Sequence, residues 1–206
     1  MFQITINHSG LSLGEIEAIN NLFSDYPTYE DKVDNDFEYA SILEIEFIKY
    51  KDIAFFDFIP IEKWSILIEI IKNIKKRRGK KGLRFMIIIT EEERSNYDDE
   101  KLEDVEVPTK EKSIYFNKAI FILNHKNDLD FIKGLERIEI TIENLVEIQE
   151  LQKLKDESNS GKNNSTNKNN QNGSENDKVK SIIFTFNEIN RKWIRFTDNK
   201  IDVKGG

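Results

Sequence analysis

The sequence contains no cysteine at any of its 206 positions. That absence excludes disulfide bonds, thiol nucleophiles, cysteine-ligated zinc and iron–sulfur clusters, so a packed core must stabilise the fold. Histidine is nearly as scarce, with two residues, His8 and His125. Imidazole is the usual general acid or base near neutral pH, so any acid–base chemistry that uses histidine must use one of these two residues.

Long apolar runs are also missing. The longest near-apolar stretch, Phe85–Ile89, is far shorter than the roughly 20 residues of a membrane-spanning helix. The chain opens with MFQITINHSG, which lacks the basic start and apolar run of a signal peptide. We therefore expect a cytoplasmic protein with no membrane contact, and the frequent Ile, Lys, Asn and Glu suggest a prokaryotic source.

Positive charge is in deficit, with 31 basic against 38 acidic residues and a net charge of −7. A negative balance argues against broad, non-specific binding to nucleic acid or anionic lipid. Residues 156–178 contain no apolar side chain and therefore cannot offset the entropy lost on ordering. This composition predicts that residues 156–178 are a disordered insertion rich in Asn, Ser and Lys.

The first strand and helix are indicated by local patterns. Phe2, Ile4 and Ile6 alternate with polar residues, which is the period of a half-buried strand. Ser12 and Glu15 then have the spacing of a capping box, in which each side chain satisfies a backbone amide at a helix start.

The following segments extend this series to strand, helix, strand, strand, helix, strand. Ala40–Lys49 and Ile53–Ile59 predict two strands joined by a short turn, and Pro60 favours the start of a second helix. Leu83–Thr90 is apolar almost throughout, so we expect a strand covered on both faces. This order predicts an α+β protein with a ferredoxin-like βαββαβ domain over residues 1–92.

The second half is predicted to begin after an acidic connector at residues 93–112. Residues 113–206 form a smaller α+β part, for which a degenerate second ferredoxin-like unit is one arrangement. The expected elements are a strand at Ser113–Leu123, a helix at Asp128–Leu135, a strand at Arg137–Ile142, a helix at Asn144–Lys155 and a hairpin of Val179–Phe186 with Lys192–Phe196.

Two activities hosted by ferredoxin-like folds are poorly supported. RNA-binding members stack bases on exposed aromatic rings of the third strand, and of that platform only Phe55 is present here. Core packing is the better interpretation of Phe55. Polymerase-like members hold metal between carboxylates of separate strands, but Asp52 has no partner on the first strand. We therefore expect no metal, no cofactor and no enzymatic activity.

The strongest local charge feature is a basic run at the end of the second predicted helix. We expect it to contact a partner, although phosphate or the acidic connector could also neutralise it. Its residues are Lys75, Lys76, Arg77, Arg78, Lys80 and Lys81.

The leading hypothesis is a non-enzymatic interaction module, an adaptor or regulatory partner of another protein. The main alternative is an RNA-binding or RNA-processing protein, with His8 as the candidate acid–base group. Two ferredoxin-like domains with one histidine each would resemble the CRISPR repeat-processing endonucleases, although their glycine-rich loop near the C-terminus is absent. A small-ligand sensor is a third hypothesis.

Overall fold

The computed structural model describes residues 2–34, 37–92, 118–145 and 181–196. These residues form a mixed α+β fold in which one seven-stranded sheet has the order β2-β1-β3-β4-β5-β6-β7. The strands are β1 (Gln3–Ser9), β2 (Thr28–Lys32), β3 (Ser41–Tyr50), β4 (Leu83–Glu92), β5 (Lys118–Leu123), β6 (Ser181–Asn187) and β7 (Lys192–Phe196). The α-helices are α1 (Leu13–Leu22), α2 (Phe55–Phe58), α3 (Ile61–Arg77) and α4 (Asp128–Glu143).

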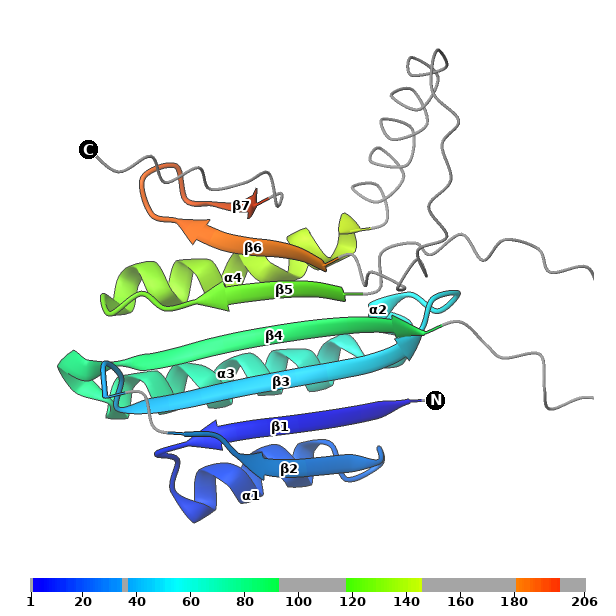
Figure 1. Ribbon diagram of the computed structural model, residues 1–206, viewed down its shortest axis with the longest axis horizontal. Coiled ribbons are helices and arrows are strands. Elements are labelled where there is room, and N and C mark those ends of the chain that lie inside the picture. The colour runs from blue at the N-terminus through cyan, green and yellow to red at the C-terminus, as the bar shows by residue number, and fades with distance from the viewer. Residues whose placement is uncertain (1, 35–36, 93–117, 146–180, 197–206) are drawn as a thin grey trace, which may run out of the picture.

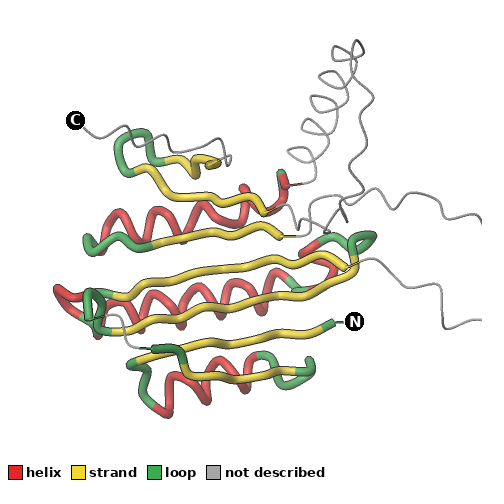
Figure 2. Tube along the Cα trace, in the orientation of Figure 1, coloured by secondary structure: helices red, strands yellow, loops and turns green. Residues whose placement is uncertain are grey.

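Three β–α–β units follow one another along the chain. In each unit the two strands are parallel neighbours, β1 with β2, β3 with β4 and β5 with β6, and adjacent units meet in antiparallel pairs. Parallel neighbours need a long crossover connection, and a helix lies within each crossover here. Figure 2 shows the helices on one side of the sheet, while the other side is formed by strands alone in the described part of the chain.

Helices α1 and α3 start where the sequence indicates. Ser12 caps α1 in a capping box with Glu15, and Pro60 is the N-cap of α3. Gly79 follows the α3 C-cap residue with φ of 54°, a left-handed conformation that glycine adopts without a Cβ clash.

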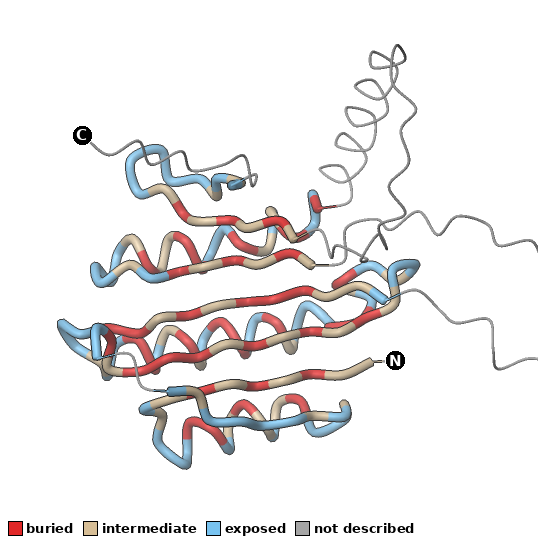
Figure 3. The backbone as a smooth tube through the Cα atoms, in the orientation of Figure 1, coloured by how far each residue is buried: buried red, intermediate tan, exposed pale blue. Residues whose placement is uncertain are grey.

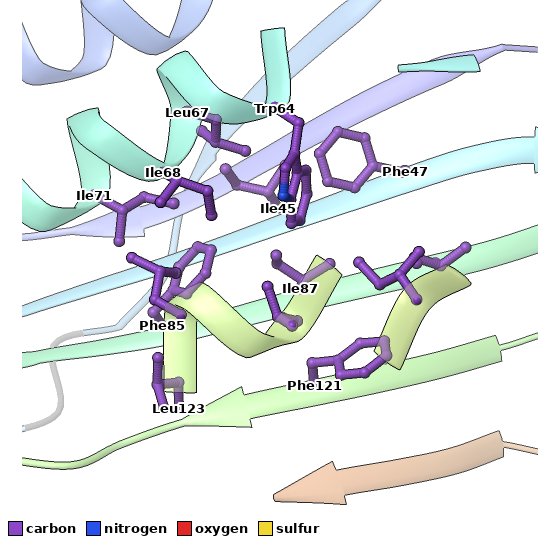
Figure 4. Close-up of a cluster of buried hydrophobic side chains, with 14 of the residues drawn as sticks. Ile45, Phe47, Trp64, Leu67, Ile68, Ile71, Phe85, Ile87, Phe121 and Leu123 are labelled. Atoms are coloured by element: carbon purple, nitrogen blue, oxygen red, sulfur yellow. The ribbon is translucent and has the colours of Figure 1, made fainter. Parts of the chain in front are cut away.

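The core lies between the helix layer and one face of the sheet (Figure 1). Figure 4 shows Trp64 and Leu67 of α3 packed against Ile45 and Phe47 of β3. Phe121 of β5 belongs to the same cluster, so one core continues across the predicted boundary between the two halves. Full burial of side chains of this size stabilises the fold by about 1.5–3 kcal/mol each.

Burial alternates along the strands, as Figure 3 shows, because successive side chains point to opposite faces of the sheet. In β1 the side chains of Ile4 and Ile6 are fully buried, whereas those of Thr5 and Asn7 are partly exposed. We call the side opposite the helices the open face.

The ferredoxin-like prediction is not confirmed. A ferredoxin-like unit splits each β–α–β by inserting a strand between its two strands, whereas here the strands of each unit are direct neighbours. Thr28–Lys32, between the first predicted helix and the second predicted strand, forms strand β2, which pairs with β1 in parallel. The predicted strand Ile53–Ile59 is wrong, because Phe55–Phe58 forms the short helix α2. Short apolar runs do not distinguish a strand from a buried helical turn by periodicity.

In the second half the hairpin is confirmed, since β6 and β7 pair antiparallel on either side of residues 188–191. The predicted strand Arg137–Ile142 is wrong, because these residues continue α4 to Glu143. The acidic connector at 93–112, the insertion at 156–178 and residues 146–155 of the last predicted helix lie outside the described residues. Within the described ranges, no helix combines the length and apolarity needed to cross a membrane.

Candidate interaction surfaces

The basic run does not form one surface, because its first residue is buried. The Lys75 side chain has no exposed area, and its Nζ donates hydrogen bonds to Asp128 Oδ1 at 2.5 Å and to the Lys126 carbonyl at 2.9 Å. The same Nζ lies 5.5 Å from the centre of the Phe131 ring. Lys75 follows Ile71 by four residues and so falls on the buried side of α3. It joins α3 to the start of α4 instead of facing a partner.

Arg78 is also used inside the molecule. Its guanidinium donates to Glu15 Oε2 and to Ser41 Oγ, which connects the end of α3 to the start of α1 and to β3. Burial alone would raise the pKa of Glu15, but hydrogen bonds from the Ser12 amide and from Arg78 outweigh burial and hold that pKa below its ordinary value of 4.5. Glu15 therefore serves both the capping box and the helix–helix contact.

The remaining cations of the run stay at the surface. Lys76, Arg77, Lys80 and Lys81 are exposed around the end of α3 and the 3₁₀ turn Gly79–Lys81. Arg77 lies 3.4 Å from Glu15, yet 63% of its side chain is exposed. No other described residue forms an ion pair with Lys76, Lys80 or Lys81. We call these four residues the basic turn.

His8 lies within β1, not in the loop after it, and is only 2% exposed. It points to the helix side with Ile4 and Ile6, and its Nε2 lies 3.0 Å from Glu30 Oε1. The hydrogen bond from His8, together with one from Asn20, lowers the pKa of Glu30. This arrangement joins β1, β2 and α1.

His125 is distant from His8. It follows β5, and its ring packs edge-to-face on Phe186 at 5.7 Å. Three strand spacings, about 14 Å, separate β1 from β5 in the sheet. The two histidines therefore do not form one acid–base pair.

The described residues form neither a base-stacking platform nor a carboxylate site for a metal. Phe55 is buried in α2 and packs edge-to-face against Phe47 and Trp64, which confirms its interpretation as a core residue. Asp52 precedes α2 and Asp57 lies within it, and both are exposed. Among the described residues, no three His, Asp or Glu side chains come close enough to hold a metal ion.

A shallow groove separates α1 from α3, lined by Gly14, Glu15, Asn73 and Arg77 among others. Its volume of about 110 Å³ is well below the roughly 300–1,000 Å³ of typical small-molecule sites. It offers little support for a small-ligand sensor.

The open face is apolar over one half of the sheet. Strand registers place two rows of side chains across β4 to β7: Met86, Ile122, Thr185 and Ile194 in one row, and Ile88, Ile120, Ile183 and Phe196 in the next. We call the seven apolar members of these rows the apolar strip. Most are partly exposed, and Phe196 reaches 59%.

The other half of the open face is polar. Thr5 and Asn7 of β1 lie opposite Glu46 and Glu44 of β3. Glu46 accepts hydrogen bonds from Thr90 at 2.7 Å and Lys118 at 3.0 Å. Glu44, directly beside Met86, forms no ion pair with a described residue. A carboxylate therefore borders the apolar strip.

Sequence reasoning predicted that Leu83–Thr90 would be covered on both faces. In the described part of the chain the helices cover one face only. The signal for the apolar strip was present, since β4 and β5 are apolar at both odd and even positions. A strand exposed to water on one side normally alternates apolar and polar residues.

No family model, no curated protein and no solved structure matches this chain in comparisons with known proteins.

Proposed function

We propose that this protein is a non-enzymatic interaction module that binds a protein partner through the apolar strip of its open face. The single observation that supports this role is the apolar character of β4 and β5 on both faces, when helices cover only one of them among the described residues. Contiguous exposed apolar patches of this kind commonly mark protein–protein interfaces.

Charge indicates what kind of partner fits. The apolar strip is bordered on the β3 side by Glu44, and the exposed carboxylate of Asp31 lies in the same row at the β2 edge. We therefore expect a partner that presents apolar side chains flanked by cations, because complementary charge steers and orients association. Phosphate groups of RNA would be repelled by the same carboxylates.

The basic turn is a second, separate surface in this proposal. Lys76, Arg77, Lys80 and Lys81 project from the end of α3, on the helix side of the molecule, and Lys75 and Arg78 position that turn from within. Such a turn could contact an acidic segment. The RNA-binding alternative depends on the same basic turn, since exposed cations bind phosphate.

Site-specific photo-crosslinking tests the proposal on the full-length protein in cells of its source. A photoreactive amino acid replaces Ile120, at the centre of the apolar strip, and Lys80, in the basic turn. Glu17, exposed on α1, is the matched control position. We expect light-dependent adducts with a protein at Ile120 and none at Glu17.

Two results would contradict the proposal. One is an Ile120 variant that gives no protein adduct while its circular dichroism spectrum stays native. The other is an adduct at Lys80 that ribonuclease removes, with none at Ile120. That second pattern would establish the RNA-binding alternative.

A further inference from the structure

The two edges of the sheet differ in their protection against further pairing. β2 forms one edge with the sequence Thr-Tyr-Glu-Asp-Lys, and its last three side chains are charged and exposed. Among the described strands β7 forms the other edge, with the sequence Lys-Trp-Ile-Arg-Phe, where Ile194 is 37% and Phe196 is 59% exposed. Charged residues on an edge discourage pairing with another chain, whereas exposed apolar residues on an edge favour it.

We propose that β7 is a dimer edge, at which two copies of this chain pair antiparallel across a two-fold axis centred on Ile194. The axis stands perpendicular to the sheet, so the helix layers of both copies lie on the same side. We assign a second copy of this chain as the pairing partner, because the side chains of β7 are self-complementary in this register.

The register follows from charge. Centred on Ile194, each Lys192 lies opposite Phe196 of the other copy, and each Trp193 lies opposite Arg195. Each of the five residues of β7 then lies opposite a residue of the second copy, and no like charges face each other. Centring on Lys192 or on Arg195 would place identical cations opposite one another, which destabilises a strand pair. Centring on Trp193 would place Arg191 of one copy opposite Arg195 of the other.

Each side of the joined sheet gains a favourable contact. On the helix side, Trp193 packs against Phe121 and Phe186 and donates to the Gly134 carbonyl at 3.1 Å, so its ring is held in place. In this register the aliphatic stem of Arg195 from the second copy lies opposite that ring and can pack against it. On the open face, the two Ile194 side chains meet at the axis and join the two apolar strips into one.

This inference concerns the edge of the sheet and is separate from the partner proposed for its face. Sedimentation equilibrium of the full chain over a range of concentrations gives the first measurement. We expect a species of twice 24.3 kDa. Ile194→Lys should raise the dissociation constant at least about tenfold, because it places two like charges together at the axis. Ile189→Lys, at a turn residue that is 91% exposed, should leave the constant unchanged.

The absence of cysteine permits a second test that does not depend on Ile194→Lys remaining folded. Ile194→Cys should form a disulfide-linked dimer under mild oxidation, since the two Cα atoms at the axis lie within the roughly 7 Å that a disulfide spans. Lys192→Cys should not, because four residues separate it from the position opposite, about 14 Å along the strand. The combination of Lys192→Cys and Phe196→Cys should form the bond again.

A monomeric protein at all concentrations would overturn the dimer. Oxidation of Lys192→Cys or Ile189→Cys as fast as Ile194→Cys would overturn the register. Photo-crosslinking at Ile120 to a different protein would leave the open-face proposal standing in either case, so the two failures are distinguishable.

Discussion

The two faces of the sheet differ in how they hold ionisable groups, although Glu46 of the open face is paired with Lys118. On the covered face, buried charges are held by partners: Lys75 by Asp128, Glu15 by Arg78, and Lys49 by Glu91 at 2.7 Å. On the open face, the carboxylate of Glu44 lies beside apolar side chains without an ion pair to a described residue. The covered face is organised for stability, whereas the open face is the surface for which we propose a binding role.

The free-energy cost of burying a charge explains this difference between the two faces. Burial of an unpaired charge costs several kcal/mol, so the covered face can include ionisable groups only where a partner is built in. Side chains on the open face are not buried by the helices, so their charges do not need a built-in partner. The sequence of this face can therefore vary to suit binding. Substitutions that compare neighbouring residues on the two faces should therefore give very different stabilities.

The largest expected difference lies between two adjacent residues of β5. Leu123 is 1% exposed on the covered face, whereas Ile122 is partly exposed on the open face. Leu123→Ala should lower the free energy of unfolding by about 2–5 kcal/mol through lost burial and a cavity, and Ile122→Ala by less than about 1 kcal/mol. Urea unfolding measures both. Equal losses would mean that the open face is covered in the native protein.

A smaller effect is expected from adding a methyl group between helix and sheet. A Cβ at Gly134 of α4 would lie 2.5 Å from Leu123 Cδ1 and 3.1 Å from Phe186 Cγ, whereas a Cβ at Gly14 of α1 meets nothing within 4 Å. Gly134→Ala should destabilise the protein by about 1–3 kcal/mol. Gly14→Ala should stabilise it by about 0.5 kcal/mol through helix propensity. Thermal unfolding distinguishes the two, and a stable Gly134→Ala variant would contradict the close packing of α4.

The pairing of Lys75 can be tested through its partner. Asp128→Asn leaves the buried ammonium with the Lys126 carbonyl but without a counter-charge, and should cost about 1–2 kcal/mol. Asp130→Asn is the matched control, because Asp130 also lies in the first turn of α4. Chemical denaturation of the two variants should separate them, and identical stabilities would show that Lys75 does not need its ion pair.

The smallest effect concerns acid stability. Glu15 and Glu30 have folded-state pKa values below the ordinary 4.5. Their contribution to stability is thus complete above that value and is lost as the pH falls through the folded-state pKa values. Glu15→Gln should cost about 1 kcal/mol at pH 7 through the capping box and should flatten the fall in stability below pH 4.5.

Unfolding curves recorded between pH 3 and pH 7 check this expectation. Glu17→Gln, on the exposed side of α1, is the control and should retain the wild-type slope. A Glu15→Gln variant with that same slope would show that Arg78 does not stabilise the charged carboxylate.

The burial of two residues of the candidate surfaces could have been predicted from the sequence alone. His8 follows Ile4 and Ile6 with a period of two, which already places it on the covered face. Lys75 follows Ile68 and Ile71 at helical spacing, which indicates burial despite its basic neighbours. Both signals are periodic. In both cases the polar or charged nature of the residue favoured an exposed position in the prediction instead. The apolar character of β4 and β5 on both faces was also present in the sequence. That the helices leave one of these faces uncovered could not be predicted, because it depends on which strands are neighbours and on which side the helices lie.

Local chemistry in the sequence determined where several elements begin and end. The Ser12–Glu15 capping box, the Pro60 start and the glycine after α3 depend on residues within one turn of each other, so short-range rules predict them. The β6–β7 hairpin is of the same kind. Tertiary structure alone decided the rest. β2 is a charged edge strand, and β1 is its one partner among the described strands. α2 is a helical turn because Phe55 packs on Phe47 and Trp64. The residues of Arg137–Ile142 are helical because Ile138 and Ile142 face the core. Strand order and the open face arise from pairings between distant segments, whose stability depends on the whole sheet and not on any local pattern.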